Sequence, residues 1–319
     1  MFSSRRNDLL SFAAEDSFFA DIVHDVVDFG VDISFSYTNR NGAYHPQGLA
    51  TEHLNTPEKQ AQFAQGFWQA QMRGDMKARI ILPALGGKAA QAHLMLHELM
   101  HFYQDMLGMY FIPLQQKDVH PIMLDARSHI SAILFNEAWA EVETLRTCWA
   151  LNKKGKRTGW RGAVRSKDWR SLAKLYDEKL QAGVDEAVAA AAIFKAWYEG
   201  AHRGFYEAHA LKSYDELVLR LKSEEENLRT LTFDDILARI PSEKLPKYMN
   251  MIDWGEQILT PNINLEQYPR AHSTDVIDIQ CGAAPYIWKR LRGAEIAHAD
   301  IPEQELKMNA NVSGDGAVG

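Results

Sequence analysis

The residues with the clearest capacity for chemistry are two histidines and a glutamate in the segment HELMH. His97, Glu98 and His101 form an HExxH arrangement. On a helix, positions four apart project to the same side one turn apart, so both imidazoles can bind one Zn²⁺. Glu98 stands next to the first ligand and can deprotonate a water molecule at that metal. The pattern predicts a hydrolytic zinc site with Glu98 as its base. The alternative is a buried helix whose histidines are satisfied by hydrogen bonds.

A second acidic motif could supply the third protein ligand that a catalytic zinc site requires. Glu137 and Glu141 are four residues apart in the segment NEAWAE, so they share one face of a predicted helix. One carboxylate can bind the metal while the other accepts the free N–H of a ligating histidine. The alternative is a solvated acidic stripe, but the broad apolar face of this segment argues that its carboxylates need partners.

Together, these two motifs resemble the gluzincin class of zinc metallopeptidases, whose third ligand is a glutamate on a later helix. The segments HELMHFYQ and EAWAE are also similar to a bacterial metallopeptidase family without an assigned substrate, over about residues 37–150. The resemblance implies one zinc per chain and a peptide or protein substrate. It also implies Glu137 as the third ligand, with Asn136 and Glu141 in supporting positions. Gluzincins usually carry aspartate where Glu141 stands, which leaves open that Glu141 binds the metal instead.

Hydrolysis at a carbonyl also requires a donor for the oxyanion that forms. The segment WYEGAHRGFYEAH presents a polar and aromatic stripe at helical spacing, consisting of Tyr198, His202, Tyr206 and His209. A tyrosine or histidine of this stripe is a candidate donor, and the alternative is an aromatic packing face with hydrated polar tips. Arg127 and His129, just before the glutamate helix, are weaker candidates for the same role.

Three further side chains near the motifs have a structural explanation as well as a chemical one. His93 continues the histidine series one turn earlier, and we expect it beside the ligands or simply in the core. Gln104 lies three residues after His101 and either bonds near the site or belongs to the helix surface. Cys148 follows the glutamates within an apolar segment, which favours buried core over a sulfur ligand.

The elements that must position these residues belong to an α+β fold that is predominantly helical. Alternating apolar residues predict strands at 31–37 and 77–82, with a weaker one near 48–55. Helical spacing predicts helices at 9–30, 56–73, 88–108, 119–151, 165–182, 185–209 and 213–229. The resemblance adds the expectation of a zincin-like arrangement, in which a small N-terminal sheet and the HExxH helix are followed by a helical C-terminal half.

The same patterns predict how the chain is divided. Residues 1–152 are predicted to form the zincin-like α+β catalytic region, and residues 163–300 a helical region that completes the cleft. Residues 301–319 are expected to be a disordered tail. The basic stretch 153–170 is either a solvated connector or a docking surface for an acidic partner.

The composition of the chain excludes several classes of function. The chain has 319 residues, a net charge of −7 and two cysteines, Cys148 and Cys281. The acidic balance argues against dedicated nucleic-acid binding, and the cysteine count excludes a disulfide scaffold. The chain contains no apolar run long enough to predict a membrane span or an export signal. We therefore expect a cytoplasmic protein. Two alternatives to a zinc metallopeptidase remain: a structural or regulatory zinc-binding protein, and a partner-docking helical protein without catalysis.

Overall fold

The computed structural model describes residues 2–37, 42–45, 78–85, 87–107, 109, 122–124, 126–200, 202–210, 229–231, 240 and 242–252. Helices dominate this part of the chain: α1 Phe2–Ala13, α2 Ser17–Asp28, α4 Lys88–Met106, α5 Ala126–Lys153, α6 Thr158–Arg165, α7 Arg170–Gln181 and α8 Glu186–Glu199. The strands are β1 Asp32–Ser36, β2 Ala43–His45, β3 Arg79–Pro83, β4 Ile122–Leu124 and β5 Arg229–Leu231. Two 3-10 helices follow, η3 Ser242–Lys244 and η4 Lys247–Met251, and residues 202–210 are also helical. The predicted predominantly helical α+β class is confirmed.

The three-stranded sheet has β3 at its centre. The order is β1-β3-β2, with β1 parallel and β2 antiparallel to β3. The run RIILP lacks polar–apolar alternation, as expected of a strand covered on both faces, and Ile80 and Leu82 are fully buried. Within the described sheet β2 is an edge strand. A short turn after β3 leads directly into α4, so the sheet fixes where that helix begins.

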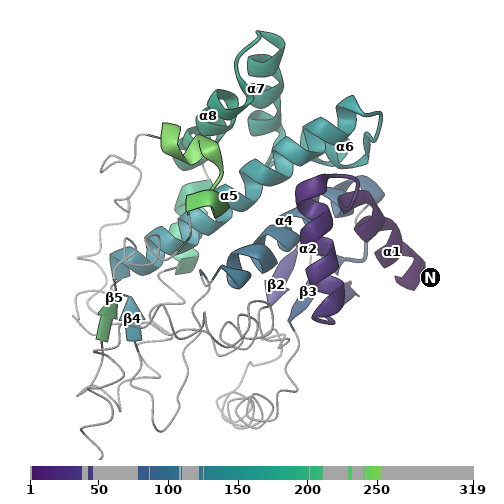
Figure 1. Ribbon diagram of the computed structural model, residues 1–319, viewed down its shortest axis with the longest axis horizontal. Helices are drawn as coiled ribbons and strands as arrows, with labels where there is room; N and C mark the ends of the chain where they lie inside the picture. Colours follow the sequence, from purple (N-terminus) through teal and green to yellow (C-terminus); the bar gives the residue numbers. More distant parts are fainter. Residues whose placement is uncertain are drawn as a thin grey trace, which may run out of the picture.

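Helices α4 and α5 pack against each other in the interior of the described region (Figure 1). Helix α1, α2 and β3 contact α4 on one side, while α8 contacts α5. Residues on several faces of α4 are buried, among them Ala92, Met95, Leu96, Leu99 and Met100. A helix buried on most of its circumference is held in position by its neighbours rather than by one apolar stripe. Polar side chains on α4 are therefore forced into the interior, where they need partners.

The N-terminal helix predicted at 9–30 is two helices, α1 and α2, so that prediction was wrong in its continuity. The break lies at Asp16, which has an extended backbone and caps α2. Its carboxylate accepts hydrogen bonds from the backbone N–H groups of Phe18 and Phe19. An aspartate that satisfies two free N–H groups stabilises a new helix start more than continuation of the old helix. The apolar spacing was preserved across the break, which is why the pattern did not reveal it.

Other helix boundaries also differ from those predicted from the sequence. The segment predicted as one helix over 119–151 contains strand β4 before α5, and the 165–182 helix begins only at Arg170. Ser166 ends α6 in an extended conformation, and its hydroxyl accepts from the N–H groups of Asp168 and Trp169. The 185–209 helix is interrupted around Gly200, which ends α8. The strands at 31–37 and 77–82 and the helix at 88–108 are confirmed within a few residues.

Helix α6 lies within the basic stretch 153–170 and packs against both α4 and α5. Its inner face is made of Gly159, Gly162 and Ala163, all buried, while its arginines are exposed. A Cβ atom on Gly162 would overlap the backbone carbonyl of Ala89 on α4 and press on the Cβ of His93. The close approach of α6 to the histidine helix therefore depends on glycine.

We expect Gly162→Ala to lower the free energy of unfolding by about 1–3 kcal/mol, because a helix backbone cannot yield as a side chain can. Urea denaturation of the variant checks this. The matched control is Gly204→Ala, where a Cβ meets no atom within 4 Å. If Gly162→Ala were as stable as the control, the close packing of α6 on α4 would be contradicted.

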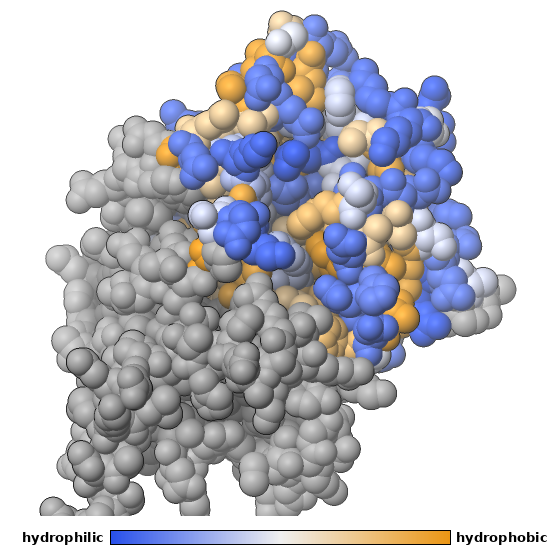
Figure 2. All heavy atoms as spheres, in the orientation of Figure 1, coloured by the Kyte–Doolittle hydropathy of each residue, from blue (hydrophilic) through white to orange (hydrophobic). Residues whose placement is uncertain are grey.

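Hydrophilic side chains cover most of the described surface on the face shown in Figure 2, and apolar ones gather around α1 and α2. Among the described residues no helix combines the length and apolar character needed to cross a membrane. Several predictions lie outside the described residues: the strand near 48–55, the helices at 56–73 and 213–229, and the tail 301–319. The division into a 1–152 and a 163–300 region stays a prediction.

Candidate metal centre

Helix α4 and helix α5 bring the two sequence motifs together. His97 and His101 project from α4 towards Glu137 on α5, and the two histidines are almost fully buried. One nitrogen of each histidine and one carboxylate oxygen of Glu137 lie within 4.8 Å of one another. Among the described residues, this is the one group of histidine, cysteine and carboxylate side chains that could hold a metal ion.

The separations within this cluster match a tetrahedral ion. His97 Nε2 lies 3.0 Å from His101 Nε2. The two oxygens of Glu137 lie 3.4 Å from His97 Nε2 and 3.5 Å from His101 Nε2. Ligands placed about 2.0–2.1 Å from a tetrahedral Zn²⁺ are roughly 3.3 Å apart. These separations, in which each Glu137 oxygen faces a different histidine, are close to those between neighbouring ligands of a tetrahedral metal ion.

The hydrogen bonds of His101 determine which of its nitrogens carries the proton. Gln104 Nε2 donates to the carbonyl of Asn136 at 2.7 Å, which orients the amide so that its oxygen faces His101 Nδ1 at 2.9 Å. An amide oxygen only accepts, so His101 Nδ1 donates, and Nε2 of the neutral ring carries a lone pair. Gln104 is fully buried and is therefore part of the site rather than of the helix surface.

Glu141 plays the corresponding role behind His97. One of its oxygens lies 3.3 Å from His97 Nδ1, and the other lies 3.5 Å from His93 Nε2. Its side chain is 0% exposed, so the carboxylate needs these two imidazoles as partners. A proton on His97 Nδ1 facing Glu141 leaves the Nε2 lone pair facing Glu137 and His101. In that tautomer, lone pairs of His97 Nε2, His101 Nε2 and the Glu137 carboxylate converge in a buried space, where a cation, either a proton or a metal ion, would stabilise them.

The pKa values of the residues in the cluster are shifted because these groups lie so close together. Burial alone would lower the pKa of His97, but the contacts with Glu137 and Glu141 outweigh it and raise that pKa well above its ordinary value. Burial would raise the pKa of Glu137, yet His101 and His97 together hold it well below the usual range. His93 and His97 lower the pKa of Glu141 in the same way, against the effect of its burial. Both carboxylates are therefore ionised and can bind a positively charged group.

His93 extends the cluster inward to Cys148. The Cys148 Sγ atom lies 3.9 Å from His93 Nδ1. Burial raises the pKa of this thiol, and the nearby Glu141 raises it further, so it stays protonated. Cys148 is consequently an inert core residue that can donate weakly to His93, as the apolar surroundings predicted. His93 is both in the core and in contact with Glu141.

Of the four residues in the predicted donor stripe, Tyr206 is the one that lies at the cluster. Burial raises the pKa of its hydroxyl, as do a hydrogen bond to Glu137 and the charges of Glu98 and Glu141. The hydroxyl therefore stays protonated and can donate. Tyr198 is buried in the core, with Arg203 above its ring.

The remaining candidates are placed elsewhere. His202 Nε2 bonds to the carbonyl of Asp168 at 2.9 Å, and His209 is exposed. Burial, followed by the charge of His209, lowers the pKa of His129 to about 4, so His129 is a neutral core residue. The side chain of Asn136 donates to the carbonyl of Met109 rather than to the cluster, although its own carbonyl orients Gln104. The side chain of Arg127 lies outside the described residues.

Trp169 is a site residue that the sequence patterns did not reveal. Its ring stacks on His97 with centroids 6.0 Å apart, and His202 stacks on Trp169 at 4.7 Å. His93 lies 6.0 Å from the same ring. Trp169 therefore covers the side of the cluster that the histidines form. It stands just before α7 in the basic stretch 153–170, where no local pattern indicates a contact with the histidines.

Gly42 is a second residue to which the sequence patterns assigned no role at the site. It directly precedes β2, and a Cβ atom there would fall on the carboxylate of Glu98. The backbone entering the edge strand thus lies against the predicted general base. A glycine is required at this position for space, since its backbone angle φ is not in the left-handed region.

On the prediction that Glu98 is the general base of a peptidase, we expect Gly42→Ala to displace the Glu98 carboxylate and to lower kcat for peptide hydrolysis by about a hundredfold, as a displacement near 1 Å does. Zinc content should be unchanged, because no proposed ligand moves. Steady-state kinetics and elemental analysis of the same preparation check both parts. Gly87→Ala is the control, since a Cβ there meets no atom within 4 Å. Unchanged kcat in Gly42→Ala would remove Glu98 from the reaction geometry.

Comparison with known proteins adds one finding. The family model described as "Putative metallopeptidase family (DUF6782)" matches residues 60–240, which is more than half of the 319-residue chain. The matched stretch contains α4, α5 and the helical residues around Tyr206. No curated protein and no solved structure matches the chain significantly.

Proposed function

The chain belongs to the family described as "Putative metallopeptidase family (DUF6782)", and we propose that it is a zinc-dependent peptidase of the gluzincin type. The observation that carries this proposal is the convergence of His97 Nε2, His101 Nε2 and the Glu137 carboxylate, with separations of 3.0–3.5 Å. Two histidines and one carboxylate form the ligand set of zinc peptidases, which leaves one position for water. Glu141 and Gln104 then hold the two imidazoles in the required tautomers.

The protein's own residues supply the acid–base chemistry around that ion. Zinc, when bound, lowers the pKa of a water molecule towards ~7 and polarises the scissile carbonyl. Glu98 lies next to His97 on α4 and is buried, so its carboxylate is shielded from bulk solvent. In the proposed reaction Glu98 accepts the proton of the attacking water and later donates it to the leaving amine. The C–N bond breaks as that amine is protonated.

Tyr206 is the proposed oxyanion donor. Its raised pKa means that the hydroxyl keeps its proton throughout the working pH range. As negative charge develops on the carbonyl oxygen, the tyrosine hydroxyl can exchange its hydrogen bond with Glu137 for one with that oxygen. A donor already positioned in a dry site stabilises the transition state more than the ground state.

The position of β2 supports a peptide as the substrate. Strand β2 is the edge of the described sheet and begins at Gly42, against Glu98. An extended peptide can add to an edge strand through main-chain hydrogen bonds, which would place its backbone beside the general base. A zincin-like fold, with this strand above the HExxH helix, is part of the proposal.

Metal removal tests the function. Purified protein is assayed on a mixture of fluorogenic peptides before and after dialysis against a chelator, and again after one equivalent of zinc. We expect hydrolysis to disappear on chelation, to return with zinc and to be inhibited by hydroxamates, which occupy the open coordination position. Hydrolysis that survives complete removal of metal would contradict the proposal. Stable zinc binding with neither peptide cleavage nor hydroxamate binding would identify a structural zinc site instead.

A further inference from the structure

Glu141 connects the proposed ligand His97 to a third histidine of α4. Its two oxygens lie 3.3 Å from His97 Nδ1 and 3.5 Å from His93 Nε2. The side chain is 0% exposed, and among the described residues these two imidazoles are its ion-pair partners. A carboxylate that is held at one oxygen alone can turn about its last side-chain bond, because that torsion has only a broad preference. Contacts at both oxygens fix the plane of the carboxylate, and His93 provides one of them.

The contacts of His93 also determine which of its ring nitrogens carries the hydrogen. An ionised carboxylate only accepts, so the nitrogen that faces Glu141, Nε2, must donate. The other nitrogen, Nδ1, lies 3.9 Å from the Cys148 Sγ atom. Burial, followed by the charge of Glu141, raises the pKa of this thiol, so it keeps its hydrogen and can donate weakly to Nδ1. The hydrogens of Cys148 and His93 are thus both directed towards Glu141.

Helix α6 packs directly against His93 and Cys148. A Cβ atom on Gly159 would lie 2.6 Å from Cys148 Sγ, and one on Gly162 would lie 3.1 Å from His93 Cβ. Trp169, which follows α6, has its ring 6.0 Å from that of His93. The His93 side chain is 3% exposed and Cys148 is 0% exposed, so bulk water is not an alternative partner for either. The glycine face of α6 therefore fixes the positions of both side chains.

We propose that His93 is a positioning residue of the metal centre, which donates from Nε2 to Glu141 and so holds that carboxylate against His97 Nδ1. Cys148 keeps His93 in this tautomer by donating to Nδ1. A histidine whose Nδ1–H is firmly bound is a stronger metal ligand at Nε2. This role rests on the proposed function, because it acts through a ligand of the proposed zinc ion.

Two substitutions of nearly the same shape separate this role from packing. His93→Gln keeps an N–H donor at about the reach of Nε2, whereas His93→Met has the same length and no donor. We expect His93→Met to weaken zinc binding about tenfold, and His93→Gln to stay within about threefold of the wild type, as the loss and retention of an orienting partner do. Added to Glu141→Ala, His93→Met should cause no further loss, since it acts through that carboxylate. Competition with a fluorescent zinc chelator gives all the affinities.

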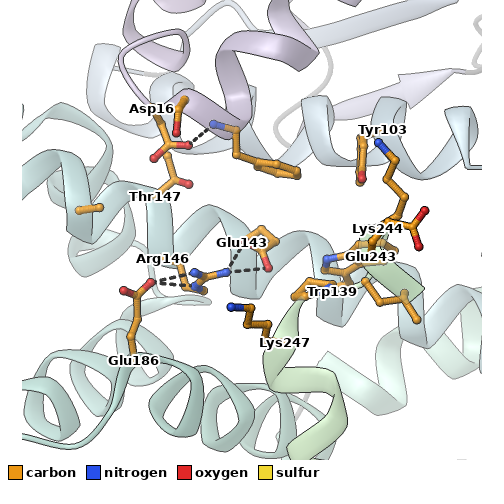
Figure 3. Close-up of a pocket in the computed structure, with 15 residues that line it drawn as sticks. Asp16, Tyr103, Trp139, Glu143, Arg146, Thr147, Glu186, Glu243, Lys244 and Lys247 are labelled. Carbon is orange, nitrogen blue, oxygen red and sulfur yellow. Dashed lines mark hydrogen bonds and ion pairs between the residues drawn. The ribbon is translucent and has the colours of Figure 1, made fainter. Parts of the chain in front are cut away.

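The opposite face of α5 provides a control for general damage to the helix. Helical spacing places Arg146 there, beside a pocket that none of the proposed zinc ligands lines (Figure 3). Arg146 binds Glu143 at 2.9 Å and Glu186 at 2.8 Å. Arg146→Met should lower the midpoint of urea denaturation, because it removes the cation that pairs with the buried Glu143, but it should leave the zinc affinity unchanged.

The tautomer of His93 can be observed in the wild-type protein itself. In ¹⁵N NMR of histidine-labelled protein, where His93→Gln identifies the His93 signals, we expect a hydrogen on Nε2 and none on Nδ1. A hydrogen on Nδ1 would overturn the proposal. Equal zinc affinities of His93→Gln and His93→Met, or a loss with His93→Met that persists in the Glu141→Ala background, would also overturn it. If the wild type binds zinc and His93→Met binds it equally well, the positioning role alone is wrong, whereas a wild type that binds no zinc overturns the proposed function as well.

Discussion

Replacing Glu98 with glutamine should slow peptide hydrolysis by roughly a thousandfold while leaving zinc bound. Glutamine keeps the size of the side chain and its place beside Gly42, but the amide cannot accept the proton of the attacking water. General base catalysis of this kind contributes about 10²–10⁴ in rate, so kcat should fall by roughly a thousandfold. The zinc content should equal that of the wild type, since Glu98 is not a proposed ligand.

The measurement is kcat on the best fluorogenic peptide, with zinc content determined on the same sample. Glu199→Gln is the matched control, because this exposed glutamate on α8 pairs with Lys195 and should tolerate the same substitution without effect. Full hydrolysis by Glu98→Gln would show that another group takes the proton, and the proposed mechanism would then be wrong.

The second large effect concerns the two glutamates on α5. Glu137→Ala should weaken zinc binding by roughly a thousandfold, because a total binding energy of about 10–16 kcal/mol is shared among three protein ligands. Glu141→Ala should weaken it about 10–100-fold, as removal of a residue that orients a ligand does. The difference follows from geometry: Glu137 faces both Nε2 atoms, whereas Glu141 faces His97 Nδ1 and His93.

Competition with a fluorescent zinc chelator gives both affinities on one scale. A larger loss with Glu141→Ala than with Glu137→Ala would exchange the two roles and make Glu141 the ligand. Because Glu141 is fully buried, its variant should also be checked for folding by circular dichroism before the affinities are compared.

The sequence predicted which side chains of α4 and α5 meet better than it predicted the residues that surround them. His97, His101 and Glu137 were identifiable because their spacing is set by the helix itself, and four-residue spacing keeps its meaning wherever the helix lies. The meeting of α4 with α5 followed from the need of a zinc site for a third ligand. The first of these inferences uses the local geometry of a helix, and the second uses the requirement of zinc for a third protein ligand.

The donor stripe shows where such rules fail. Tyr198, His202, Tyr206 and His209 share a face only if one helix is continuous, but α8 ends at Glu199 and residues 202–210 form a separate helical segment. The interruption near Gly200 separates the core residue Tyr198 from Tyr206, which reaches Glu137. Helical periodicity cannot reveal a break that preserves the spacing on either side.

Gly42 and Trp169 were missed for a different reason. Each meets the histidine helix through a contact between residues more than fifty positions apart in the chain, and no local pattern records that contact. Trp169 lies in the basic stretch 153–170, and Gly42 lies in the segment 39–42, Asn-Arg-Asn-Gly, which is typical of a turn. Tertiary packing gave both residues their positions at the site.

We propose that this chain holds one zinc ion through His97, His101 and Glu137, and elemental analysis of the purified wild-type protein beside His97→Ala decides whether it does. We expect about one zinc per chain in the wild type and none in the variant, after both have been supplied with zinc and dialysed. A wild-type protein without zinc after that treatment, or a His97→Ala variant that retains it, would mean that these residues do not form a zinc site.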